Sequence, residues 1–273
     1  MPFSNSVVVA ALCQLKKNWR QAVILAALPF LVTLLDDVLF WSYTWAWGEE
    51  QSSLGEPFIM GIIGVVAILF VLTLMAIGWH RLVIQQETPS LSGLTRPFGR
   101  VFTYLFDWLI LGFLISIASF VVLMPFLLWS VESAMPYDTT ILLGETLAMI
   151  VVPYVIAGTL VLRLGLGLVA TATGRPKITF VNSWRMTRAH SRDTLIAGLW
   201  LGVLGLLVFL PTEIMQSNRG AAIAYDANMT VFDGFSSVLY AAGTVVLALM
   251  EIAMLTELYG RVFNDQQGTP DQL

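Results

Sequence analysis

Cysteine, histidine and charged residues are all scarce in this chain. Its 273 residues include one cysteine, Cys13, and two histidines, His80 and His190. A single cysteine excludes an internal disulfide, and neither histidine has partner ligands at the spacing of metal sites. Phosphate-binding glycine loops, nucleophile elbows and close carboxylate pairs with a histidine beside them are also missing. We therefore expect a protein that is not an enzyme and has no metal or cofactor.

Apolar residues make up 57% of the chain and charged residues only 12%, with a mean hydropathy of +0.79. This composition is typical of an integral membrane protein. A helix needs about 20 mostly apolar residues to cross a bilayer, and the chain contains six such stretches. The central parts of these stretches lack the alternation of barrel strands. The sequence therefore predicts one all-α transmembrane domain, residues 1–273, with six spans at 22–40, 58–79, 102–129, 147–168, 194–210 and 238–259.

The distribution of basic residues orients these six spans. Of the 14 Lys and Arg residues, only Arg219 falls on the opposite side of the membrane from the others. The connections on the side of Arg219 are instead acidic, and include Asp36, Asp37, Glu49, Glu50, Glu56, Glu132, Asp138, Glu213, Asp226 and Asp233. Because Lys and Arg favour cytoplasmic connections, we expect both termini in the cytoplasm. Each histidine is then expected at a cytoplasmic helix end.

The amino terminus has a short apolar run that ends at Cys13. A lipoprotein signal would need a basic residue before the run and a small residue before the cysteine, whereas Leu12 stands there. The spacing instead predicts an amphipathic interfacial helix. Its apolar stripe would contain Val8, Leu12, Leu15 and Trp19, and its polar side Gln14, Lys17 and Asn18.

The ends of the three returning spans are similar in sequence. Trp79-His80-Arg81 is followed by Glu87-Thr88-Pro89, Tyr259-Gly260-Arg261 by Gly268-Thr269-Pro270, and Arg163 more distantly by Gly174-Arg175-Pro176. One interpretation is a threefold repeat of tandem helical hairpins. Chance similarity is the alternative.

A family resemblance is carried by residues 163–198. Arg163-Leu164-Gly165-Leu166, then Gly174-Arg175-Pro176, then Ser183-Trp184-Arg185-Met186-Thr187-Arg188 form a returning helix, a turn and a Ser-Trp-x-x-Thr segment. This pattern resembles uncharacterised bacterial six-span inner-membrane proteins, which include YciC-like proteins and the membrane domain associated with glycerophosphodiester phosphodiesterases. The turn at Trp79-His80-Arg81 fits the same resemblance. It implies a fold and a location in the bacterial inner membrane, but it transfers no active site.

Three ionisable residues fall inside or near the predicted spans, namely Asp107, Arg163 and Glu251. Charge in lipid costs about 3 kcal/mol even on lenient scales. Arg163 could pair with Asp107 or with Glu251 across a helix interface. The functional interpretation is a relay for protons or substrate, and the structural one is an ion pair or a side chain that extends to water.

Small and basic residues suggest further contacts. Gly198, Gly202 and Gly205, and likewise Gly61 and Gly64, have the spacing of close helix contacts, which we expect within the bundle. Arg185, Arg188 and Arg192 would share one helix face at headgroup level, where they could bind acidic lipid phosphates or simply enforce orientation. Pro29, Pro125 and Pro153 can kink their spans, as in transporters, but proline is also ordinary in membrane helices.

The leading hypothesis is a non-enzymatic membrane protein that acts as an accessory, assembly or scaffold component of a membrane complex, or that organises local lipid. The alternative is a small transporter or lipid-handling protein that uses Asp107, Arg163 and Glu251. Expected partners are membrane lipids and another membrane protein or a second copy of the chain, and not nucleic acid.

Overall fold

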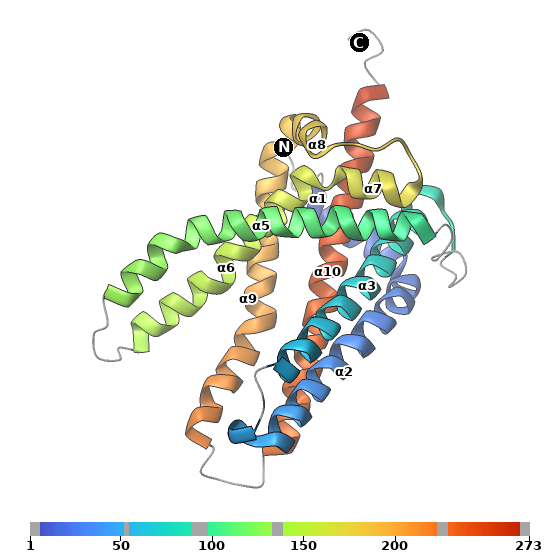
Figure 1. The fold of residues 1–273 in the computed structure, drawn as a ribbon. Helices are drawn as coiled ribbons and strands as arrows, with labels where there is room; N and C mark the ends of the chain where they lie inside the picture. Colours follow the sequence, from blue (N-terminus) through green and yellow to red (C-terminus); the bar gives the residue numbers. More distant parts are fainter. Residues whose placement is uncertain (1–5, 52–54, 89–97, 133–138, 223–228, 268–273) are drawn as a thin grey trace.

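A computed structural model describes residues 6–51, 55–88, 98–132, 139–222 and 229–267. Within these ranges, the side chains of 40–51, 55–58, 60, 126–132, 139–150, 212–222, 229–233 and 265–267 lie outside the description. The described part of the chain is helical and contains no strand, as the sequence predicts. Figure 1 shows long helices that gather at the end of the molecule where α1, α7 and α8 lie.

The helices follow one another with short connections. In chain order they are α1 (Val7–Lys17), α2 (Trp19–Gln51), α3 (Gly55–Gln85), α5 (Phe98–Glu132), α6 (Thr139–Leu164), α7 (Leu166–Thr173), α8 (Phe180–Met186), the 3₁₀ turn η2 (Thr187–His190), α9 (Ser191–Ala222) and α10 (Met229–Gln267). Consecutive long helices pack together, α2 on α3, α5 on α6 and α9 on α10, and α6 also packs extensively along α9.

Five stretches of the described residues are long and apolar enough to cross a membrane, and a sixth is added if α6 and α7 count as one bent span. The protein is therefore a multi-pass helical membrane protein, as the composition predicts. The count of six spans, the orientation and the threefold repeat stay predictions. Most of the acidic residues in the connections between spans, and Arg219, lie outside the described side chains.

The fourth predicted span is not one straight helix. It breaks at Gly165, where α6 and α7 meet at an angle of 53°. A side chain at Gly165 would lie 2.5 Å from the carbonyl oxygen of Val161 and 3.1 Å from a methyl group of Leu255, so only glycine fits this bend. The corresponding Trp79-His80-Arg81 segment is not a turn, because α3 continues through it to Gln85. The similarity of the returning spans in sequence therefore does not extend to their shape.

Glycine also ends α7. Gly174 has a φ of 70°, and the N–H of Arg175 donates to the carbonyl of Ala170 at 2.9 Å. This is the left-handed glycine cap that satisfies carbonyls at a helix end. The cap turns the chain out of α7 and toward α8, which Figure 1 shows crossing the same end of the molecule.

The amino-terminal segment is helical, but its buried side differs from the predicted stripe. Ser6 caps α1 by accepting a hydrogen bond from the N–H of Val9 at 3.2 Å. Val7, Val8 and Ala11 are buried, and α1 packs on α10, whereas Leu12 and Trp19 are exposed. Gln14 was expected on the polar side, but it reaches α10 and donates to Glu257 at 2.6 Å. The amphipathic pattern did not reveal that a polar side chain forms part of this contact.

The wholly buried core lies toward the end of the bundle that contains α7. Its largest side chains include Trp79, Tyr104, Leu166, Leu258 and Tyr259. Helix α5 contrasts with this core, because most of its large apolar side chains, such as Phe106 and Phe113, are exposed. An apolar surface on a helix that crosses lipid has the bilayer as its solvent. In Figure 1, α5 crosses the view at a steep angle to α9 and α10.

Candidate functional site

One end of the bundle carries most of the charged side chains that the structure describes. We call it the basic end, and it is formed by α1, the beginnings of α2, α5 and α9, the ends of α3, α6 and α10, and α7, α8 and η2 (Figure 1). Hydrogen bonds tie these elements together. For example, Gln85 of α3 donates to the carbonyl of Thr173 in α7 at 2.8 Å.

Ser183 of α8 bridges the break between α6 and α7 with hydrogen bonds. Its hydroxyl donates to the carbonyl of Arg163 at 2.8 Å and accepts from the N–H of Leu166 at 3.2 Å. These two backbone groups lie on either side of the bend. Thr187 adds its hydroxyl, which donates to the carbonyl of Ser183 at 2.9 Å and lies 3.3 Å from that of Arg163. The serine and threonine of the Ser-Trp-x-x-Thr segment therefore stabilise a bent helix.

The hydrogen bonds of Ser183 should contribute to the stability of the folded protein. We expect Ser183→Ala to lower the free energy of unfolding by about 1–3 kcal/mol, because it leaves buried backbone groups at the bend without their partner. Asn182→Ala is the matched control, since Asn182 is its exposed neighbour in α8. Unfolding by SDS titration, followed by circular dichroism, measures both. Equal values for the two variants would contradict the bridging role of Ser183.

Arg163 lies at the end of α6 and is half-buried. Its guanidinium carbon is 3.6 Å from the centre of the Trp184 ring, a cation–π contact. The Nε of Arg163 is buried and has no hydrogen-bond partner among the described residues. Arg188 is close enough to repel it electrostatically. The Ser-Trp-x-x-Thr segment that stabilises the bend thus also positions the guanidinium group of Arg163. This cation has no acidic partner in the described part of the chain.

The three arginines predicted to contact lipid lie on the elements that come after α7 in the chain. Arg185 lies in the last turn of α8, Arg188 lies in η2, and Arg192 lies in the first turn of α9. All three are exposed. In the part of the chain that the structure describes, none of their guanidinium groups forms an ion pair. The 3₁₀ turn separates them onto three consecutive elements instead of one continuous helix.

Asp107 is not paired with Arg163, the partner that the sequence suggested for it. It is nearly buried in α5 and accepts from Lys177 at 3.0 Å. Lys177 precedes α8, and its side chain is 61% exposed. Among the described residues, Arg163 pairs with neither Asp107 nor Glu251. The structure therefore does not bring the three residues of the predicted relay together.

The exposure of Lys177 limits the value of this ion pair. We expect Lys177→Gln to change the free energy of unfolding by less than about 1 kcal/mol, because water screens the pair and the amide can still donate to Asp107. The same SDS titration checks this, and the small effect should shrink further at high salt. A loss as large as that of a core truncation would show that the pair is stronger than its exposure indicates.

Glu251 lies deep in α10, in the wall of a cavity of about 90 Å³. The cavity is bounded by α3, α5 and α10, and Thr73 and Trp108 are its other residues with polar atoms. Among the described residues, Glu251 has no hydrogen-bond or ion-pair partner. Of the three predicted relay residues, it alone faces a space that could receive a ligand.

His80 lies near the end of α3 and is wholly buried. Its Nδ1 lies 2.8 Å from the hydroxyl of Thr256, and its Nε2 lies 3.2 Å from the hydroxyl of Tyr104. Thr256 itself donates to the carbonyl of Ile252 at 2.6 Å. Because a hydroxyl has one proton, this assigns the proton of the ring to Nδ1 and makes Tyr104 the donor to Nε2. The network joins α3, α5 and α10, and nothing in the sequence pattern indicated it.

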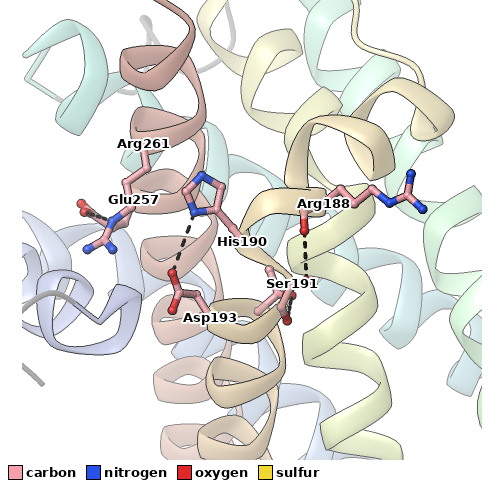
Figure 2. Close-up of polar contacts among 7 residues, drawn as sticks. Arg188, His190, Ser191, Asp193, Glu257 and Arg261 are labelled. Atoms are coloured by element: carbon pink, nitrogen blue, oxygen red, sulfur yellow. Dashed lines mark hydrogen bonds and ion pairs between the residues drawn. The ribbon is translucent and has the colours of Figure 1, made fainter. Parts of the chain in front are cut away.

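A second set of polar contacts lies on α1, on α10 and at the start of α9 (Figure 2). Arg261 donates to Glu257 at 2.9 Å, and the same carboxylate accepts from Gln14 of α1. His190 lies 3.8 Å from Asp193, and Figure 2 shows its ring directed toward α10. In the part of the chain that the structure describes, no group of three or more His, Cys, Asp or Glu side chains is placed to hold a metal ion.

Comparison with known proteins identifies no relative of this chain. No family model, no curated protein and no solved structure matches the chain. The structure thus defines the class, a multi-pass helical membrane protein. The resemblance to YciC-like six-span proteins stays a prediction from residues 163–198.

Proposed function

We propose that this protein is a non-enzymatic component of the bacterial inner membrane that organises acidic lipid at its cytoplasmic, basic end. The phosphates of lipid headgroups would lie among Arg163, Arg185, Arg188 and Arg192. Such a protein can serve as a scaffold for a membrane complex by holding a shell of defined lipid around it.

The observation that carries the proposal is the unpaired charge around Arg163. Its guanidinium is fixed over the ring of Trp184, its Nε has no described partner, and Arg188 lies beside it. Cations that repel one another are stabilised by an anion between them, and arginine binds phosphate through several donors at once. Of the two acids that the sequence suggested as partners of Arg163, Asp107 is paired with Lys177, and Glu251 forms no ion pair among the described residues.

The setting of the arginines also favours a lipid phosphate. Exposed tryptophan rings are typical of the membrane boundary, and Trp184 is 41% exposed beside Arg163. Basic residues next to a membrane helix attract acidic lipid by about 1 kcal/mol each. An acidic headgroup bound here would have its phosphate among the arginines and its chains along the apolar surface of the helices.

Lipid retention tests the proposal. The full chain is placed in nanodiscs of phosphatidylglycerol and phosphatidylethanolamine, released, and examined by native mass spectrometry. We expect the wild type to retain phosphatidylglycerol in preference. Changing Arg185, Arg188 and Arg192 together to Gln should weaken that retention by more than about tenfold, since roughly 1 kcal/mol is lost per charge.

The matched control removes three cations elsewhere on the basic end. Lys16, Lys17 and Arg20 are also exposed, so changing all three to Gln alters the net charge by the same amount. This control should retain phosphatidylglycerol better than the first variant, because it loses diffuse charge but none of the arginine donors that lie near Arg163. Equal losses in both triple variants would mean that acidic lipid is attracted only by diffuse charge. No preference in the wild type would overturn the proposal outright.

A further inference from the structure

The cavity beside Glu251 is lined by none of the arginines of the basic end. It lies between α3, α5 and α10, and its wall is mostly aliphatic: Leu69, Leu72, Ala76, Leu105, Leu109, Ala248 and Ile252. Three side chains break the aliphatic wall, namely the carboxylate of Glu251, the hydroxyl of Thr73 and the indole of Trp108. The volume of about 90 Å³ holds several water-sized groups.

Glu251 lies within the apolar part of α10, which runs from Gly234 to Asn264. Along the helix axis it is about 9 Å from Glu257, the next charged residue of α10 toward the basic end. A carboxylate at such depth is costly unless a proton or a cation neutralises it. None of the described side chains supplies that cation.

The lining of the cavity selects among cations. Metal ions such as Mg²⁺ and Ca²⁺ require about six or more oxygen ligands, whereas this cavity offers one carboxylate and one hydroxyl. An indole ring and a carboxylate in an apolar wall instead suit an ammonium ion with methyl groups, because the ring attracts the spread charge and the wall accepts the methyl groups. The chemistry of the wall therefore favours an organic cation.

We propose that this cavity binds a small organic ammonium ion. The carboxylate of Glu251 pairs with its charge, the ring of Trp108 contacts its methyl groups, and the aliphatic side chains exclude water. This site is independent of the arginines of the basic end, so either proposal can fail without the other.

Tetramethylammonium chloride is the probe. The full chain in detergent is heated with increasing probe, and with sodium chloride at equal ionic strength, while its unfolding midpoint is recorded. A ligand that binds only the folded state raises the midpoint in a saturable way. We expect that rise in the wild type, and an affinity at least about tenfold weaker in Glu251→Gln, since the charge pair is lost. Trp108→Leu should weaken binding about two- to tenfold.

Glu257→Gln is the control on the same helix. Glu257 pairs with Arg261 and does not line the cavity, so its loss should leave the affinity for the probe unchanged. Ala248→Leu provides a second route if Glu251→Gln does not fold. It fills the cavity but keeps the carboxylate, and it should abolish the rise.

Three results would overturn the proposal. The first is a wild-type midpoint that responds no more to tetramethylammonium than to sodium. The second is an equal response in Glu251→Gln, as expected if Glu251 only carries a proton. The third is an equal response to tert-butanol, a neutral molecule of similar size, which would show that filling the cavity suffices without charge pairing.

Discussion

Leucine in place of Gly198 is expected to separate α6 from α9 and to lower the free energy of unfolding by more than about 3 kcal/mol. The two helices approach so closely here that even a methyl group on Gly198 would lie 2.9 Å from the carbonyl oxygen of Val155 and 3.0 Å from the backbone nitrogen of Thr159. Facing it, a methyl group on Gly158 would lie 3.3 Å from the Cα of Gly198. Backbone atoms at these distances cannot move aside without a shift of the whole helix.

Gly61 is the matched control. It also lies in a transmembrane helix, α3, but a side chain built there meets nothing within 4 Å. Gly61→Leu should therefore leave stability unchanged or raise it slightly, because leucine favours the helix over glycine by roughly 0.5–1 kcal/mol. SDS titration of both variants gives the difference. A cost for Gly61→Leu that equals that of Gly198→Leu would show that the close approach of α6 and α9 is not the cause.

These glycines also show what the sequence could predict. The spacing of Gly198, Gly202 and Gly205 predicted packing within the bundle, and this is confirmed, since side chains at all three would meet residues of α6. The same prediction is wrong for Gly61, where a side chain would meet nothing within 4 Å, whereas one at Gly64 would meet Asp36 of α2. The long helices were equally predictable, because a bilayer imposes a minimum apolar length. In both cases the signal lies within one short stretch of chain.

Contacts between helices could not be predicted in the same way. In a soluble helix, the polar face reveals which side is buried, but a membrane helix is apolar toward both lipid and protein, so its rotation leaves little trace in the sequence. The pairing of Asp107 with Lys177 and the burial of His80 depend on that rotation. The bend at Gly165 was missed for a related reason, since it is fixed by Ser183, which follows it by 18 positions.

Alanine in place of His80 is expected to lower the free energy of unfolding by about 3–5 kcal/mol, as for the truncation of other buried rings. The ring fills space at the meeting point of α3, α5 and α10, and both of its nitrogens have hydrogen-bond partners. Its loss leaves a cavity and removes the acceptor for the hydroxyl of Tyr104. Thr256 is less affected, because its hydroxyl still donates to the carbonyl of Ile252. In His80→Ala, the hydroxyl of Tyr104 is therefore the buried donor that is left without an acceptor.

A double-mutant cycle separates the two parts of this cost. Tyr104→Phe alone should cost about 1 kcal/mol, since it removes one hydroxyl from a satisfied network. In the His80→Ala background the same change should be neutral or stabilising, because the hydroxyl is then a buried donor without its acceptor. Tyr240→Phe is the control, because Tyr240 is 40% exposed in α10. Its effect should be the same with and without His80. If Tyr104→Phe cost the same in both backgrounds, the hydrogen bond from Tyr104 would contribute nothing, and the role of His80 would be reduced to filling the space between the three helices.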